Sequence, residues 1–521
     1  MNVPRLRPAA AETVHPVVLE RRVSDLLVTG AAALVAGVVA LALTLALPHV
    51  SFVLVLGAIA AIAAIVALMS SGRLDLTVAL IVLYLGLLDG PVKLMLGQRE
   101  VTAALQDVLI LAVGAGALMR IVVRREPVRL PALFGWVFAW TALVVMNAFN
   151  PRTEGILHTL GGFRQQLQYV PFFFFAYVLM RSKRRFRQYF VIVTVMALAN
   201  GVVGAYQTGL SPSQLASWGP GYRSLIYTEG NGGARVYASE GEGRVRPPGL
   251  GSDQGFSGLM GEVALPACLA LLVLWRKRRW LAALLCLGAM IAVAVGLARL
   301  ALIGAGLSTV VFAALAALSG RRVTRSVAAV LALLLIAVAA GALLASTLRS
   351  GTFRRYERIG LNNETTLHQE GAWSKIPKYV AAEPLGFGLG TSGPVSGFGG
   401  KVTNLLEGHG LTSETEYNVL VKELGVPGLV LWPAMTLYVM FLIAMGMRRV
   451  RDPDLAICLA GSLALFFVFP IEGFSAFLGS GAAIGPYYWF ALGVAGYWFA
   501  GPGRGRLGKS SVDEDGQRTP A

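Results

Sequence analysis

The amino-acid sequence predicts an all-α polytopic membrane protein with about 14 transmembrane helices and two extended extracytoplasmic loops. Hydrophobic residues make up 55% of the 521-residue chain, charged residues only 14%, and the mean hydropathy is +0.65. A soluble domain carries roughly a quarter charged residues. Apolar runs recur from Leu26 to Ala500, and each approaches the ~20 residues with which an α-helix crosses ~30 Å of hydrocarbon. A transmembrane β-barrel would show short alternating segments instead.

The apolar runs set the boundaries of the expected elements. The first run is too long for the hydrophobic region of a cleavable signal peptide, so we expect it to remain as a span. Residues 26–500 form the expected transmembrane domain, and residues 209–254 and 346–423 within it are long enough to fold outside the membrane. The spans are expected at residues 26–47, 52–70, 74–96, 101–121, 131–149, 167–180, 189–208, 255–275, 280–298, 300–318, 326–345, 424–446, 455–471 and 484–500.

The positions of Lys and Arg predict the orientation. Cationic loops are retained in the cytoplasm, and with these spans every basic cluster falls on the side of the N-terminus. Residues 1–25 and 501–521 are therefore expected to be cytoplasmic tails of a multi-pass protein in the bacterial cytoplasmic (inner) membrane. The net charge of +17 is then a topology signal, and no nucleic-acid partner is expected, because the basic residues form no patch on a soluble module. The clusters are Arg21–Arg22, Arg120–Arg129, Arg181–Arg187, Arg276–Arg279, Arg321–Arg325, Arg448–Arg451 and Arg504–Lys509.

Two acidic residues lie inside predicted spans, where a charge is costly and marks a candidate functional group. Asp107 and Glu262 each stand six or seven residues in from the outer end of a span, which is a depth of roughly 10 Å at 1.5 Å per residue. Acids at equal depth would suit one outward-open cavity. The alternative is that each pairs with an arginine or a backbone group and fixes two helices together.

Arginines on the outer side predict an anion site. Arg246 stands just before a span, Arg299 occupies a very short outer turn between two helices, and Arg164 lies in the short outer segment of residues 155–168. A guanidinium group is always charged and binds phosphate oxygens in a bidentate manner. Several such groups at the membrane surface fit a lipid-linked pyrophosphate. The alternative for Arg299 is that it reaches ordinary lipid headgroups.

The second long loop contains a predicted surface helix around residues 369–382, followed by a glycine-rich turn at residues 386–390. The turn lacks the preceding strand that a dinucleotide-binding motif requires, so we expect no nucleotide site. Ser413 and Glu416 fit a capping box, which gives Glu416 a structural role. The three cysteines fall in spans without metal-binding spacing, and no cofactor or metal is expected.

Taken in order, these segments resemble the O-antigen ligase and O-antigen polymerase superfamily of bacterial envelope enzymes. The family histidine position is occupied by Glu414, with His409 five residues upstream, and Ser252-Asp253-Gln254 replaces the family's Asn-Pro-Asn-like triplet. The four matching segments are Arg246-Pro-Pro-Gly249-Leu-Gly-Ser-Asp253, Arg299, Trp373 with Glu383-Pro-Leu-Gly-Phe-Gly-Leu-Gly390, and Glu414-Thr-Glu-Tyr417-Asn-Val-Leu-Val-Lys-Glu423-Leu-Gly425-Val-Pro-Gly428.

The resemblance implies a metal-independent membrane glycosyltransferase. Its donor would be a glycan on undecaprenyl pyrophosphate, its acceptor a glycan or a lipid, and its partners other polysaccharide-assembly proteins. Arg246, Arg299 and Arg164, with Asp253 of the first segment, are then substrate-binding candidates. Glu414 is the candidate base and His409 the second; because the family histidine is absent, polymerase is favoured over ligase.

Two competing interpretations remain. The first is a lipid-linked oligosaccharide flippase or another polysaccharide-export transporter, which can also have fourteen spans. The second is a non-catalytic subunit of an export complex.

Overall fold

The computed structural model describes residues 74–97, 106–107, 110, 113–114, 130–153, 155–227, 245–320, 328, 373–393, 415–477 and 484–508. The chain divides into two compact units, one of residues 1–78 with 112–127 and one of residues 79–111 with 128–521. The helix packing and the candidate site described below belong to the second unit.

The described part of the chain is helical and contains seven helices that are long and apolar enough to cross a membrane. The all-α class is therefore confirmed. Predicted spans 26–47 and 52–70, and nearly all of 101–121 and 326–345, lie outside the described residues. The seven membrane-length segments are α3 (Leu74–Leu83) continuing through η1 (Tyr84–Leu88) into α4 (Asp89–Leu96), α9 (Lys183–Thr208), α12 (Phe256–Leu274), η2 (Arg276–Arg278) with α13 (Arg279–Val295), α14 (Arg299–Leu318), α19 (Glu416–Met447), and α20 (Pro453–Leu463) with η6 (Ala464–Phe467) and α21 (Phe469–Glu472).

Three other predicted spans are shorter helices. Residues 131–149 give α6 (Phe134–Asn147), and residues 484–500 give α22 (Gly485–Ala495) followed by η7 (Gly496–Ala500). The expectation of one span at 167–180 differs from the structure, which has α7 (Gly155–Leu167) and then the nine-residue α8 (Pro171–Leu179). Val170 before Pro171 keeps helical angles, with φ −51° and ψ −36°. Pro171 has no backbone N–H with which to continue the hydrogen bonds of α7.

The two long polar segments are partly helical. Residues 209–254 contain α10 (Pro212–Ala216) and α11 (Pro220–Ile226). The surface helix expected around residues 369–382 is described from residue 373 on, where η4 (Trp373–Lys375) leads into α18 (Ile376–Ala382). Helix α19 begins eight residues earlier than expected, and Gly425 breaks its regular path with φ 65° and ψ −154°.

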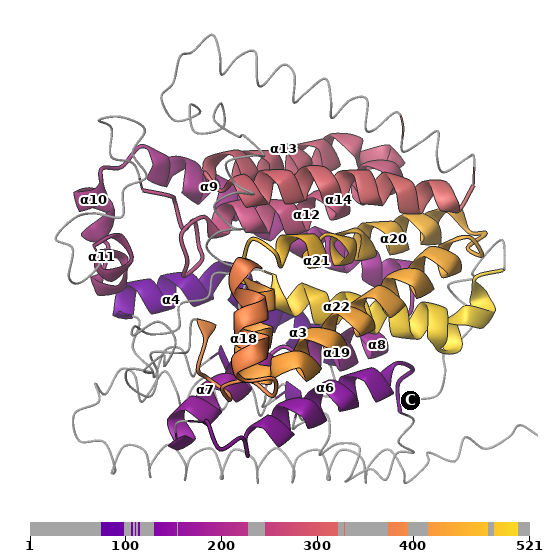
Figure 1. The fold of residues 1–521 in the computed structure, drawn as a ribbon. Coiled ribbons are helices and arrows are strands. Elements are labelled where there is room, and N and C mark those ends of the chain that lie inside the picture. Colours follow the sequence, from indigo (N-terminus) through magenta and orange to yellow (C-terminus); the bar gives the residue numbers. More distant parts are fainter. Residues whose placement is uncertain are drawn as a thin grey trace, which may run out of the picture. The chain divides into compact units, whose positions relative to one another are not determined.

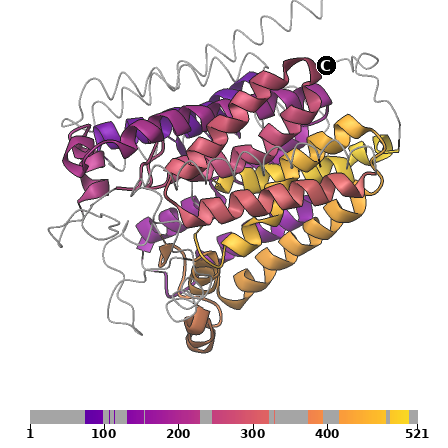
Figure 2. The same ribbon diagram turned by 90° about the horizontal axis from the view of Figure 1, so that it is seen from above.

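Helices α9, α12, α13 and α14 lie side by side (Figures 1 and 2). Glycines bring their backbones into direct contact, as in many membrane helix pairs. A Cβ atom on Gly261 of α12 would lie 2.5 Å from the Ala289 carbonyl oxygen of α13, and one on Gly201 of α9 would lie 2.7 Å from the Gly288 carbonyl oxygen. Larger side chains at these positions would force the helices apart.

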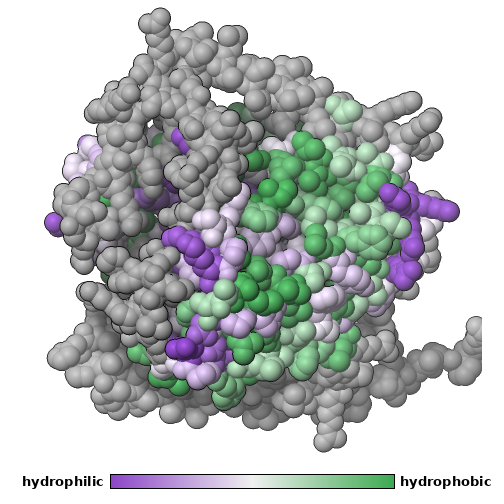
Figure 3. Space-filling view, viewed as in Figure 1, coloured by the Kyte–Doolittle hydropathy of each residue, from purple (hydrophilic) through white to green (hydrophobic). Residues whose placement is uncertain are grey.

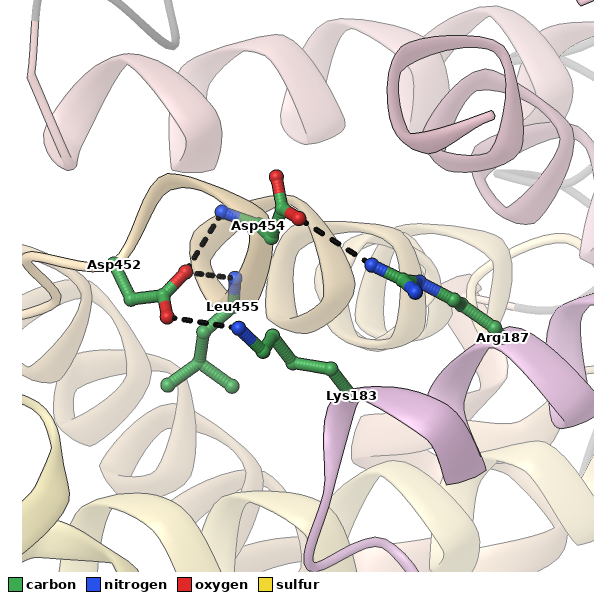
Figure 4. A network of polar contacts seen from close by, with 5 residues as sticks. All are labelled: Lys183, Arg187, Asp452, Asp454 and Leu455. Carbon is green, nitrogen blue, oxygen red and sulfur yellow. Dashed lines mark hydrogen bonds and ion pairs between the residues drawn. The ribbon is translucent and has the colours of Figure 1, made fainter. Parts of the chain in front are cut away.

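One end of the bundle collects basic segments that are distant in sequence. Lys183 of α9 pairs with Asp452 at 3.1 Å, and Arg187 pairs with Asp454 at 3.3 Å (Figure 4). The other carboxylate oxygen of Asp452 accepts hydrogen bonds from the first amides of α20, so this residue is also the helix cap. The amide of Arg451 donates to the Leu507 carbonyl oxygen at 2.9 Å. Three of the predicted basic clusters, Arg181–Arg187, Arg448–Arg451 and Arg504–Lys509, thus lie at the same end of the helical bundle.

On the face shown in Figure 3, a band of hydrophobic residues lies between hydrophilic residues at its two ends. The membrane-length helices expose large hydrophobic side chains, among them Val202, Leu302 and Phe441. An apolar belt between polar ends is what contact with a bilayer requires.

η8 (Pro502–Arg506) completes the described elements.

Candidate functional site

The glycine-rich turn of residues 384–393 packs against both α7 and the break in α19. Gly386, Gly388 and Gly390 all have positive φ, a conformation that costs glycine little. A Cβ atom on Gly390 would lie 2.1 Å from the His158 carbonyl oxygen, and one on Gly386 would lie 2.5 Å from that of Glu423. The turn is therefore a tightly packed structural joint.

Glu423 of α19 is the centre of this joint. Its side chain is fully buried, and its carboxylate accepts hydrogen bonds from Gln165 Nε2 at 3.0 Å, Gln166 Nε2 at 2.8 Å and the Gly390 amide at 3.0 Å. A buried carboxylate is tolerated when donors satisfy its oxygens. Glu423 thereby joins α7, the glycine-rich turn and α19.

Two aromatic residues of the sequence motifs meet on one segment after α21. Trp373 donates from Nε1 to the Phe474 carbonyl oxygen at 2.7 Å, and its ring meets the Phe474 ring edge-on. The Tyr417 ring lies 4.3 Å from that of Phe474, and its hydroxyl donates to the Pro470 carbonyl oxygen at 2.9 Å. The third and fourth motif segments therefore converge in space.

The start of α19 corrects the predicted cap. Thr415 is the N-cap, and its hydroxyl accepts from the Asn418 amide at 3.3 Å. The Glu416 amide donates to the carbonyl oxygens of Gly473 and Ala476, both at 3.0 Å. The N-cap hydrogen bond is therefore made by Thr415 and not by the predicted capping box of Ser413 and Glu416.

The Glu416 carboxylate lines a narrow, partly open cavity. Its lining residues come from α6, α7, α19, α21, α22 and the residue just before α22. Glu416 is 2% exposed and Gln165 1% exposed, and Gln165 Oε1 has no hydrogen-bond donor within the described structure. The lining residues are Trp140, Gln165, Gln166, Glu416, Trp432, Phe469, Ile484, Gly485, Tyr488 and Trp489.

The segments that carry Arg246 and Arg299 lie together at the end of the bundle opposite the basic clusters. The Pro247 carbonyl oxygen, adjacent to Arg246, accepts from the Gly255 amide at 3.2 Å. A Cβ atom on Gly255 would lie 3.3 Å from the Cβ of Ala298, the residue before Arg299. Both arginine side chains are partly buried. The first two motif segments are therefore neighbours.

A short chain of contacts joins this region to the cavity. Gly304, which follows Arg299 by five residues on α14, faces Glu472, and Gly473 packs against the Cβ of Glu416. The arginine-bearing end of α14 and the cavity carboxylate are thus connected through α21. The structure places the four motif segments at one end of the same bundle.

The remaining predicted site residues are placed differently or not described. Arg164 forms an ion pair with Asp107, with 2.6 Å between Nε and Oδ2. Asp253 is exposed before α12. Glu414 and His409 lie outside the described residues.

Asp107 and Glu262, the two acidic residues predicted to lie inside spans, have different partners and do not share one. Asp107 pairs with an arginine, as the alternative interpretation expected. Glu262 faces Glu472 instead, and both are buried without a hydrogen-bond donor among the described residues. Asp89 is also buried and pairs with Lys93 at 2.8 Å. Glu472 was not expected, because it lies one residue beyond its predicted span, although a Glu beside an apolar run is a visible signal.

No family model, curated protein or solved structure matches this chain.

Proposed function

We propose that this protein is a membrane glycosyltransferase of the O-antigen polymerase type. It transfers a glycan from undecaprenyl pyrophosphate to the hydroxyl group of an acceptor glycan on the extracytoplasmic face of the cytoplasmic membrane. The observation that carries the proposal is the cavity lined by the Glu416 carboxylate, Gln165, Gln166 and aromatic rings. It lies at the end of the bundle away from the basic clusters, which are expected to be cytoplasmic.

In the proposed reaction the acceptor hydroxyl oxygen bonds to the anomeric carbon of the donor sugar. The bond from that carbon to the pyrophosphate oxygen breaks, and the lipid pyrophosphate leaves with its electron pair. Arg246 and Arg299 stabilise the charge that develops on the leaving group. The hydroxyl proton passes to Glu416, which takes the role of general base expected of Glu414.

The test replaces Glu416 with Gln in a strain whose own copy of the gene is deleted. The substitution keeps the side-chain shape and the backbone hydrogen bonds of α19, so the protein should reach its usual amount in the membrane. Loss of a general base lowers the rate by roughly 10²–10⁴, so long glycan chains should disappear from a gel of surface polysaccharide.

Matched variants locate the base. Glu383→Gln removes an acid that pairs with Arg152 at 2.7 Å outside the cavity, and it should leave chain length unchanged. Glu414→Gln and His409→Asn should also retain polymer. Wild-type chain lengths in Glu416→Gln, or their loss only in Glu414→Gln, would refute the assignment of Glu416.

One observation favours a second candidate, a lipid-linked oligosaccharide flippase. The Glu262 and Glu472 carboxyl groups face one another in the interior, and buried acids of this kind bind and release protons in many transporters. The membrane side on which lipid-linked repeats collect in a deletion strain separates the two functions.

A further inference from the structure

Two acidic side chains meet in the interior of the bundle. Glu262 comes from α12, and Glu472 is the last residue of α21. Both are buried, and none of their four carboxylate oxygens receives a hydrogen bond from a described residue. A buried polar group without a partner is costly, and a buried charge without one costs still more. The pair therefore needs something between its oxygens that offsets this cost.

A glycine allows the two carboxyl groups to meet. Gly304 is the residue of α14 that faces them, and a Cβ atom there would lie 2.0 Å from Glu472 Oε1 and 2.3 Å from Glu262 Oε1. One oxygen of each carboxyl group thus lies beside the same backbone position. The two oxygens are close neighbours, with no side chain of α14 between them.

No opposite charge compensates the pair within the part of the chain that the structure describes. The only ionisable group there that acts on either carboxyl group is the other carboxyl group. Other ionisable side chains on the surrounding helices act on neither of them; these include Cys268 of α12, Cys286 of α13, Arg299 of α14, Glu416 of α19, and Asp454 and Cys458 of α20.

The composition of the site favours a proton over a metal ion. Calcium takes about six to eight oxygen ligands, and magnesium demands octahedral coordination. The pair offers two carboxyl groups, and the described residues contain no group of three or more His, Cys, Asp or Glu side chains that could hold a metal. A proton, in contrast, needs only one oxygen that carries it and a second that accepts the hydrogen bond.

We propose that Glu262 and Glu472 form a proton-binding site, in which one protonated carboxyl group donates a hydrogen bond to the other and joins α12 to α21 beside α14. A hydrogen bond from a carboxyl group to a carboxylate is short and strong. Removal of the proton leaves two like charges where water is excluded, and these repel strongly at short range. The contact between the helices therefore depends on the bound proton.

The site lies directly behind the Glu416 cavity. Gly473, which follows Glu472, packs against the Glu416 Cβ, and its carbonyl oxygen accepts a hydrogen bond from the Glu416 amide at 3.0 Å. Phe469, on the same short helix as Glu472, lines the cavity. A shift of α21 that separates the two carboxyl groups would move this wall. The bound proton thereby fixes one wall of the cavity.

Infrared spectroscopy of the full chain in nanodiscs detects the proton directly. A double variant, Glu262→Gln with Glu472→Gln, removes both carboxyl groups and keeps the side-chain shapes. The wild-type spectrum minus the double-variant spectrum at neutral pH should contain the carbonyl band of a protonated carboxyl group, and exchange into D₂O should move that band to lower frequency. The control is Glu383→Gln, which removes an acid that pairs with Arg152 and should remove only carboxylate bands.

The pH dependence of stability tests whether the proton holds the helices together. Glutamates exposed to water are ionised at neutral pH, so the folded protein should bind at least one proton more than the unfolded protein. One such proton makes the unfolding equilibrium constant rise about tenfold for each pH unit. Between about pH 6 and pH 8, wild-type stability should therefore fall more steeply with rising pH than that of the double variant. Glu383→Gln should keep the wild-type slope.

Three results would overturn the inference. The first is a difference spectrum with carboxylate bands alone, and the second is the same pH slope in the wild type and the double variant. The third is a loss of wild-type stability, absent from the double variant, when choline replaces sodium and potassium at constant pH, because a metal cation would then occupy the site. If the double variant does not fold, each single Gln variant should shift the protonated band, and an unshifted band in both would refute the site.

None of these measurements uses a glycan, so the inference and the proposed function stand or fall separately. Polymer formation in cells by a protein that lacks the protonated band would overturn the proton site and leave the glycosyltransferase standing. A protonated band in a protein whose deletion leaves glycan length unchanged would support the site and overturn the enzyme.

Discussion

Glu262, Glu472 and Gly304 pack in direct contact, which leaves no room for a side chain at position 304. The two carboxyl groups are 0% and 2% exposed. A Cβ atom on Gly304 would lie 2.0 Å from Glu472 Oε1 and 2.3 Å from Glu262 Oε1. Two ionised carboxylates cannot donate to each other and repel, so the pair is stable only when one carboxyl group carries a proton that both share.

This arrangement predicts opposite effects of two substitutions on thermal stability in detergent. Glu472→Gln supplies an N–H donor to Glu262 and removes a buried charge, so the melting temperature should stay or rise. Gly304→Ala places a methyl group onto both carboxyl oxygens and should destabilise by about 1–3 kcal/mol. Gly306→Ala on the same helix is the control, because its Cβ would meet nothing within 4 Å. Equal stability of the two alanine variants would contradict the packing.

At the scale of elements, polar contacts fix helices that hydropathy alone cannot orient. Hydropathy assigned residues 416–423 to a loop because they include charged side chains. In the structure Glu416, Lys422 and Glu423 are nearly fully buried in α19, and Lys422 lies over the Tyr379 ring at 4.6 Å. The capping-box pattern of Ser413 and Glu416 indicated a helix start in this stretch, but the partners come from distant segments, so no local pattern could reveal that it is buried. The apolar parts of the seven membrane-length helices, in contrast, followed from composition.

The contact between α9 and α20 predicts a difference between two ion pairs. The side chains of Lys183 and Asp452 are 15% and 5% exposed, and those of Arg187 and Asp454 are 36% and 47% exposed. Water screens the second pair more strongly. Double-mutant cycles with Lys183→Met and Asp452→Asn should give a coupling of about 1 kcal/mol, against about 0.5 kcal/mol or less for Arg187→Met with Asp454→Asn. A larger coupling in the exposed pair would contradict this reading of the interface.

At the scale of the whole molecule, the basic clusters that the structure describes and the motif segments lie at opposite ends of the helical bundle of the second unit. The sequence predicted this separation from alternating spans and Lys and Arg positions, and it placed Arg246 and Arg299 on one side. It did not predict the Glu416 cavity, because five separate helices build it and Glu416 had a plausible local role as a cap. Features that depend on residues close together in the chain could be predicted. The enclosure of the Glu416 carboxylate by aromatic rings from distant segments could not.

The central claim is that this protein joins lipid-linked glycan repeats outside the cytoplasm. The most direct measurement is the size and membrane side of lipid-linked glycan in a deletion strain. We predict that long chains disappear and that single repeats accumulate on the outer leaflet, where an added membrane-impermeant glycosidase can reach them. Single repeats confined to the cytoplasmic leaflet, or surface glycan of unchanged length, would contradict the account.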